Sequence, residues 1–418
     1  MIQQAAQPRI KTKTDTNLRQ YMMLLILVLI IGFFQIVTGG KLLNPMNVSN
    51  IIFQNAYVVI LAVGMLLCIL TGGNIDLSVG SVVAFICACA GTFIITWKWD
   101  PYASMILCLG ISILIGMWQG FWIAYGRIPP FIMTLSGMLL FRGLTLMILN
   151  GLTLAPFPAS FLNFSTGFVF AGDPLSALNP FGLRNATSLI IGVLLALAFI
   201  ISQALGYARR KSKGYDVESL LSFVIKAAVI AAAAIALFYT LGRYRGVPTV
   251  LVTLGVILLV YSFLTSNTVI GRHLYALGGN EKAARLSGVK TKFLMFLAYT
   301  NMSFLAGVAG LVFAARLNSA SPQAGQGFEM DAIAACFIGG ASAYGGIGTI
   351  GGTLIGALIM GVLNNGMSIR GLDSNLQQVI KGSVLFIAVA FDVVSKQRLL
   401  TPVIDRAKDL LNVRGKAA

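Results

Sequence analysis

The stretch Ile51-Ile-Phe-Gln-Asn-Ala-Tyr-Val-Val-Ile-Leu-Ala-Val-Gly-Met-Leu-Leu-Cys-Ile-Leu70 contains no charged side chain. An α-helix rises about 1.5 Å per residue, so a segment of this length crosses the roughly 30 Å of hydrocarbon in a bilayer. Comparable apolar runs occupy 21–37, 77–97, 103–125, 131–151, 188–208, 219–241, 250–268, 293–314, 353–368 and 376–394. The sequence therefore predicts an all-α, polytopic membrane bundle with about 10–12 transmembrane helices.

Composition supports the same class. The chain has 418 residues, of which 57% are hydrophobic and 10% charged, whereas soluble domains carry about 25% charged residues. The net charge of +17 first suggests a nucleic-acid partner. The basic residues, however, cluster beside apolar runs, as the positive-inside bias requires. We therefore expect membrane lipid, and no nucleic acid, around this chain.

Charge counting predicts the orientation. With twelve crossings and a cytoplasmic N-terminus, the inner segments hold 20 of the Lys and Arg residues and the outer segments hold 7. This imbalance favours cytoplasmic tails at 1–20 and 395–418, with a transmembrane domain over 21–394. It places 271–292 in the cytoplasm and the long segment 152–187 outside. The run after residue 20 shows no small-residue cleavage site, so we expect a retained first span rather than a signal peptide.

Two segments indicate broken or re-entrant helices. The apolar run 332–342 is too short to cross a bilayer alone, and it leads into the glycine-rich stretch 339–352. Segment 71–76, Thr-Gly-Gly-Asn-Ile-Asp, is interrupted in the same way. Irregular backbone at membrane depth is typical of transporters. We therefore expect one or two broken helices in the bundle.

The longest basic segment between spans is Gly271-Arg-His-Leu-Tyr-Ala-Leu-Gly-Gly-Asn-Glu-Lys-Ala-Ala-Arg-Leu-Ser-Gly-Val-Lys-Thr-Lys292. Its core, 280–289, has the pattern of a short helix. Asn280 suits the N-cap, Glu281 the first turn and Gly288 the C-terminal end. Leu286 and Val289 give this helix an apolar edge. The segment is either a docking helix for a soluble partner or an ordinary solvated loop.

Several strings in this chain resemble bacterial ABC importer permeases. Ala283-Ala-Arg-Leu-Ser-Gly288 resembles the core of their cytoplasmic coupling motif, although Lys282 stands where a glutamate is usual. The whole segment 271–288 is similar to the ribose, xylose and galactose branch. So are Gly72-Gly-Asn-Ile-Asp-Leu-Ser-Val-Gly-Ser81, residues 320–335 and Gly352-Thr-Leu-Ile-Gly-Ala-Leu-Ile-Met-Gly-Val-Leu-Asn-Asn-Gly366. The resemblance covers about residues 50–395, in order.

The resemblance implies a permease subunit of an ATP-driven monosaccharide importer in a bacterial inner membrane, working by alternating access. It implies a homodimer, an ABC ATP-binding subunit that carries ATP and Mg, and a periplasmic sugar-binding protein. The block at 188–247 resembles xylose-type and multiple-sugar-type members. No Gly-x-x-x-x-Gly-Lys-Ser/Thr phosphate loop occurs in the chain, so we expect no bound cofactor and no enzymatic activity here. The residues expected to couple to the ATPase are Asn280, Glu281, Lys282, Ala283, Ala284, Arg285 and Gly288.

A different class remains open, namely a self-contained secondary transporter driven by protons or sodium. Broken helices and the intramembrane Arg142 suit such a protein. The scarcity of carboxylates within the spans argues against proton coupling. ATP-independent uptake by the isolated chain would favour this alternative.

Polar residues within the spans are candidates for the substrate path. Arg142 must face protein or water, and it either lines the path, pairs with Asp76, or bonds backbone carbonyls at a broken helix. Asp76, followed by Ser78, either caps a helix or binds sugar hydroxyls. Asn364 and Asn365 differ by about 100° around a helix, so one side chain can face the path and the other a neighbouring helix.

Acidic and cysteine residues complete the candidates. Glu329 and Asp331 stand at the outer start of a span, where they either cap the helix or meet the binding protein. Lys381 lies near a span end, and we expect it to snorkel towards water. The five cysteines occupy apolar runs without metal-ligand partners, so we expect buried hydrophobic roles and no metal site.

Overall fold

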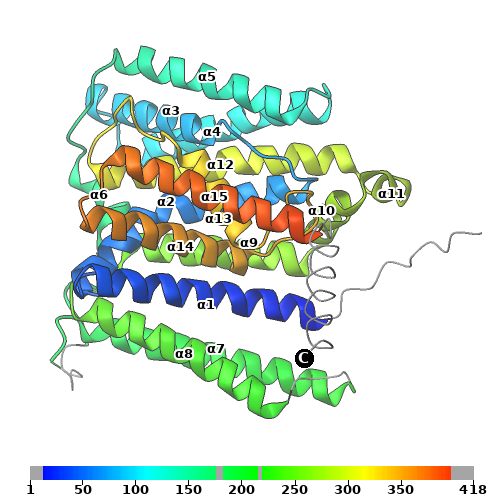
Figure 1. Ribbon diagram of the computed structural model, residues 1–418. Helices are drawn as coiled ribbons and strands as arrows, with labels where there is room; N and C mark the ends of the chain where they lie inside the picture. The colour runs from blue at the N-terminus through cyan, green and yellow to red at the C-terminus, as the bar shows by residue number, and fades with distance from the viewer. Residues whose placement is uncertain (1–12, 176–181, 215–218, 397–418) are drawn as a thin grey trace, which may run out of the picture.

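A computed structural model of the chain describes residues 13–175, 182–214 and 219–396 (Figure 1). The longer helices lie nearly side by side and form a membrane bundle. In chain order the helices are α1 (Lys13–Val37), α2 (Pro45–Leu70), α3 (Val79–Gly91, continued by the π-helical turn Thr92–Thr96), α4 (Pro101–Ala124), α5 (Pro130–Leu149), α6 (Ala159–Thr166), α7 (Ala186–Ser212), α8 (Leu220–Gly242), α9 (Thr249–Asn267), α10 (Val269–Gly279), α11 (Glu281–Leu286), α12 (Thr291–Leu317), α13 (Phe328–Ile338), α14 (Ile350–Ile369) and α15 (Ser374–Lys396).

The predicted fold class is confirmed. Ten of the described helices are long and apolar enough to cross a membrane, and α1 adds the shorter apolar helix Met22–Val37. Strand structure among the described residues is limited to β1 (Phe168–Val169), which pairs antiparallel with β2 (Val247–Pro248). The predicted spans coincide with these helices to within a few residues at most ends.

Local sequence explains where the spans begin. Asn44 accepts a hydrogen bond from the backbone N–H of Met46, and Pro45 follows it at the first helical position of α2. Asp100 accepts bonds from the N–H groups of Tyr102 and Ala103 before α4 begins. A polar cap followed by proline satisfies N–H groups that the helix itself leaves unpaired.

Helix α2 forms the centre of the bundle. Its residues from Ala56 to Leu70 are all buried, and α12, α13 and α14 pack around it. A helix that is apolar on every side is expected at such a position. Close packing depends on small residues, since a Cβ atom added at Gly64 would lie 2.7 Å from the Met302 sulfur.

The expected broken helix is α13, and it completes a crossing rather than returning to the face it left. Near the end of α12, Leu154 and Ala320 form a β-bridge at the end of the bundle that holds α6. The chain then runs inwards without helical structure over 321–327 before α13 begins. After α13, the loop 339–349 lies at the opposite end, where Gly73 contacts Ala343. The irregular segment and α13 together span the bundle.

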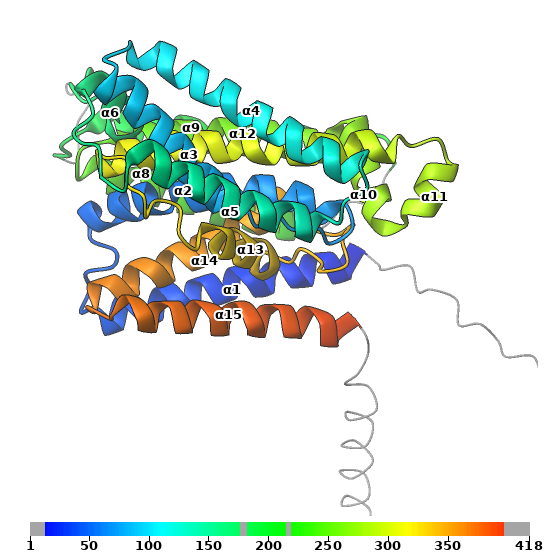
Figure 2. The same ribbon diagram turned by 90° about the horizontal axis from the view of Figure 1, so that it is seen from above.

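The connections expected to be cytoplasmic gather at one end of the molecule. Helices α10 and α11 project beyond the bundle there, beside the start of α1 and the end of α15 (Figure 2). One prediction needs correction. Residues 271–279, expected as the first part of the loop 271–292, belong to the amphipathic helix α10. Helix α11 is also shorter than the predicted 280–289.

Helices α7 and α8 form a hairpin at the edge of the bundle (Figure 1). They pack tightly, since a Cβ atom on Gly192 would lie 2.4 Å from the Cβ of Phe238. The Asn185 N–H donates to the Gly242 carbonyl at 3.0 Å. The Asp173 carboxylate accepts hydrogen bonds from the backbone N–H and the hydroxyl of Thr187, in the first turn of α7. These bonds lower the pKa of the Asp173 carboxyl group.

Candidate functional site

The projecting segment α10–α11 turns at Asn280. The Asn280 Oδ1 accepts a hydrogen bond from the Ala283 N–H at 3.0 Å, so the expected N-cap is present. Gly288 follows the end of α11 with φ of +84°, a conformation that favours glycine. Ala284 is buried on the bundle side, whereas Glu281, Lys282, Ala283 and Arg285 are exposed. The exposed face of α11 is therefore not covered by any of the described residues.

Leu286 is the most exposed large hydrophobic residue in this segment, at 90%. It is the last residue of α11, and this helix projects beyond the end of the bundle (Figure 2). Single exposed leucines are common on protein surfaces. This one, however, lies beside the exposed charges of Lys282 and Arg285 on a helix whose other side is anchored. Such an arrangement suits an apolar anchor with a charged rim.

Gly278 connects the projecting segment to the bundle core. A Cβ atom at this position would lie 1.9 Å from the Leu70 carbonyl oxygen and 2.4 Å from the Gly346 backbone nitrogen. Backbone from α10, the end of α2 and the loop before α14 therefore meet directly. We expect a displacement of α10 to move both segments, because close-packed interiors transmit strain.

Gly278→Ala is expected to lower the thermal unfolding midpoint of the purified protein, because overpacking costs about 1–3 kcal/mol. Gly279→Ala is the matched control, since nothing lies within 4 Å of its Cβ position. Fluorescence-monitored unfolding in detergent measures the effect. Equal behaviour of the two variants would contradict the proposed close contact.

Arg142 supports the irregular segment before α13. Its Nη1 donates to the carbonyl oxygens of Pro322 at 3.0 Å and Ala324 at 2.8 Å. Backbone carbonyls outside a helix need such partners at membrane depth, because no water supplies them. Of the three expected roles, this geometry matches the bonding of carbonyls at a broken helix. The pairing with Asp76 is not formed, and the Asp76 Oδ1 instead accepts hydrogen bonds from Ser78.

Asp76 lies fully buried just before α3. Its Oδ1 accepts bonds from the backbone N–H of Ser78 at 2.8 Å and from the Ser78 hydroxyl at 2.6 Å. Gln119 on α4 donates to the same hydroxyl at 3.0 Å. These bonds close a turn at Ser78, which is the N-cap of α3. The expected helix-capping role of Asp76 and a path role for Asp76 or Ser78 both stay predictions.

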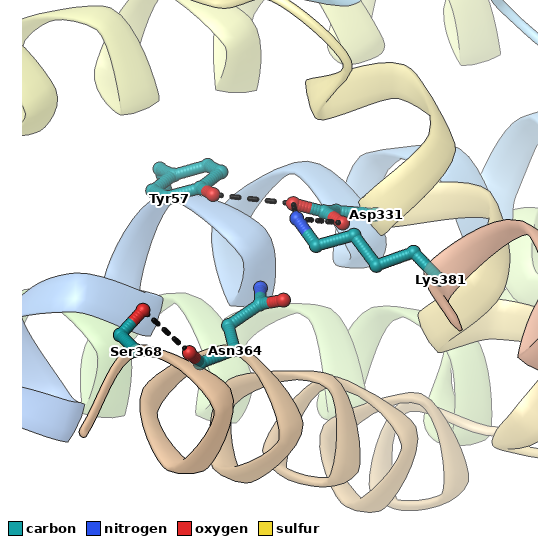
Figure 3. Close-up of polar contacts among 5 residues, drawn as sticks. All are labelled: Tyr57, Asp331, Asn364, Ser368 and Lys381. Carbon is teal, nitrogen blue, oxygen red and sulfur yellow. Dashed lines mark hydrogen bonds and ion pairs between the residues drawn. The ribbon is translucent and has the colours of Figure 1, made fainter. Parts of the chain in front are cut away.

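The two adjacent asparagines on α14 point in different directions, as the sequence predicted. Asn365 exchanges hydrogen bonds with Asn47 and donates to Gln54, so it joins α14 to α2. Asn364 is half-buried, and its Oδ1 has no hydrogen-bond partner among the described residues. Figure 3 shows the Asn364 amide pointing towards the side where Asp331 and Lys381 lie. Asn364 is therefore the better candidate for a path residue.

Asp331 is the centre of an intramembrane polar cluster (Figure 3). The Lys381 ammonium on α15 lies 3.1 Å from Asp331 Oδ1 and 3.3 Å from Oδ2. The Tyr57 hydroxyl on α2 donates to Oδ2 at 3.2 Å. The expectation that Lys381 snorkels to water is wrong, because the Asp331 carboxylate is available within the bundle. Sequence reasoning also missed Tyr57, whose partners are remote in the chain.

Glu329 and Asp331 were expected either to cap a helix or to meet the binding protein, and the structure gives the two side chains different surroundings. The Asp331 side chain is 3% exposed and engaged by Lys381, so an internal contact replaces its expected role at an outer surface. Glu329 is half-buried in the first turn of α13, and its docking role stays a prediction. The five cysteines are buried and free, as expected.

The broken crossing, the intramembrane charges and the projecting α10–α11 define a polytopic membrane permease. Residues 47–389 match the family described as the branched-chain amino acid transport system permease component. The chain is 34% identical to the xylose transport system permease protein XylH of Haemophilus influenzae, over 92% of this chain and 99% of the relative. It is 37% identical to XylH of Escherichia coli K12, over 91% and 93% of the two chains.

The ribose import permease protein RbsC of Escherichia coli K12 is 35% identical over 83% of this chain and 85% of its own length. No solved structure matches the chain. The chain belongs to this family of permease components and is a transmembrane permease of an ABC monosaccharide importer. It is the membrane component rather than a catalytic subunit.

Proposed function

We propose that this chain forms the path of a xylose importer in which a separate subunit hydrolyses ATP. The exposed Leu286 on the anchored helix α11 carries the proposal, because it offers a docking surface at the basic end of the bundle. The chain has no phosphate loop, so ATP and Mg belong to the partner. The xylose assignment rests on the relatives named for xylose transport, which align with nearly the whole chain.

The orientation follows from the charges. The end that carries α10 and α11 also carries Arg127 and the cluster Arg209-Arg-Lys211, and we propose that this end is cytoplasmic, together with both chain termini. The opposite end, with α6 and the β1–β2 pair, faces the periplasm of a bacterial inner membrane. A soluble sugar-binding protein docks at that end, with Glu329 as a candidate contact.

We further propose that two copies assemble. Helix α15 is largely exposed within one chain, and the amide side chains of Asn375 and Gln378 are exposed on it. Such amides are disfavoured against hydrocarbon and bond well across helices. A second copy of the chain covers them and completes the path between the two subunits. The mass of the purified complex by native mass spectrometry reports the copy number.

Reconstitution tests the function. The permease, the ATP-binding subunit and the sugar-binding protein are placed in liposomes with radiolabelled D-xylose. We expect uptake only with ATP and all three components, at a rate unaffected by dissipation of ion gradients. Uptake by the permease alone, driven by a proton or sodium gradient, would establish the secondary-transporter alternative instead.

A further inference from the structure

We propose that Asn364, Asp331, Lys381 and Tyr57 form a contact site for the hydroxyl groups of a neutral monosaccharide as it crosses the membrane. The inference rests on the proposed function and assigns a place in the path to four residues on four helices. Those helices are α14, α13, α15 and α2, and Figure 3 shows the side chains converging from them.

The ion pair supplies the first argument. An intramembrane lysine and aspartate are unfavourable compared with an apolar pair of the same volume, so their presence points to function. The pair is neutral as a unit, which suits an uncharged solute. The Asp331 side chain is 3% exposed, but the Lys381 side chain is 27% exposed, so the pair is partly accessible through Lys381.

The hydrogen-bonding capacity of the cluster is incompletely used. The Asn364 Oδ1 is buried without a partner among the described residues, whereas the adjacent Asn365 bonds to Asn47 and Gln54. A buried acceptor without a donor is unfavourable unless a ligand supplies the hydrogen bond. A sugar hydroxyl both donates and accepts, so it can donate to Asn364 or Asp331 and accept from Lys381.

Aromatic rings form the apolar wall of the cluster. The Tyr57 ring stacks on Phe328 with centroids 3.8 Å apart, and it meets Phe313 edge-on at 5.6 Å. This packing fixes the direction of the Tyr57 hydroxyl towards Asp331. Ligand sites typically combine an aromatic or apolar wall with a few convergent polar groups. A pyranose offers the matching surface, with C–H faces and a rim of hydroxyls.

Cysteine accessibility tests the site in the complete importer. The variant Asn364→Cys is made in the native background, whose five cysteines are buried. Its modification by a small charged methanethiosulfonate is followed in vesicles with D-xylose, sugar-binding protein and ATP. We expect D-xylose to slow the reaction at least about fivefold, because a bound sugar excludes the reagent. A sugar that the importer does not take up, such as sucrose, should have no effect.

The matched control is Ser368→Cys, one turn along α14 and exposed. Its modification should be insensitive to D-xylose. If uptake in the same vesicles is ATP-driven while D-xylose leaves the thiol of Asn364→Cys unprotected, or if that thiol never reacts, the contact site is wrong and the proposed function stands. If uptake is independent of ATP, the proposed function itself fails.

Exchanging the two charges distinguishes a role of the Asp331–Lys381 ion pair in sugar contact from a role in stability alone. Lys381→Met should reduce D-xylose uptake at least about tenfold, because it leaves the buried Asp331 unpaired. The double variant Asp331→Lys with Lys381→Asp restores an ion pair with opposite polarity. We expect the thermal midpoint of the complex to recover in this variant while uptake stays low. Recovery of uptake together with stability would show a structural tie and overturn the contact site.

Discussion

Replacing Leu286 with glutamate is expected to remove the ATP-binding subunit from the purified complex and to reduce ATP-driven uptake about a hundredfold or more. The reason is that an unpaired carboxylate buried against an apolar partner surface costs several kcal/mol. Leu286 is 90% exposed within this chain, so the change should leave the permease fold intact. Affinity purification of a tagged permease, followed by quantification of the ATP-binding subunit, measures the effect.

The choice of Leu286 matters for the control. Ala284 is only 6% exposed, so a large charged residue there would disturb α11 itself as well as any docking. Leu286→Met keeps the apolar contact and should retain the ATP-binding subunit. Stoichiometric recovery of that subunit with Leu286→Glu would contradict the docking role of α11.

Arg142→Leu is expected to produce the largest loss of stability among single changes in the bundle. It leaves the Pro322 and Ala324 carbonyls without their donor, and each unsatisfied buried acceptor costs about 1–3 kcal/mol. We expect a lower thermal unfolding midpoint and little uptake, since the segment before α13 loses its support. Arg142→Lys should retain part of both properties, because one ammonium group still donates.

The control for this prediction is Gly143→Ala on the same helix. Nothing lies within 4 Å of the Gly143 Cβ position, so the variant should unfold at or slightly above the native midpoint. An Arg142→Leu protein with the stability of Gly143→Ala would show that the two carbonyls find other partners.

The lengths of the apolar runs made most of the fold predictable from the sequence. The spans are visible from sequence because hydrocarbon thickness fixes how many apolar residues a helix needs. The helix α10 was missed because Val269–Gly279 is amphipathic and therefore carries no uninterrupted apolar run. The route of residues 321–327 depends on Arg142, about 180 positions away in sequence, and no local pattern encodes that contact.

The sequence identified most of the polar residues of the candidate site, but not which of them contact one another. The helical period required Asn364 and Asn365 to diverge, yet only the contact of Asn365 with α2 decides which one is free. Lys381 resembles a snorkelling residue from its position alone. Its partner Asp331 lies on a half-helix whose direction follows from the irregular segment before it, so the ion pair follows from tertiary structure.

The hairpin α7–α8 has a consequence for how such permeases diversify. The chain leaves the bundle at Asn185 and returns at Gly242, and the two backbones are hydrogen-bonded to each other. Because two crossings restore the chain to the face it left, every later helix keeps its direction whether or not the hairpin is there. A single insertion or deletion between these neighbouring points therefore changes which helices face the lipid. It leaves every other helix on the same side and in the same direction.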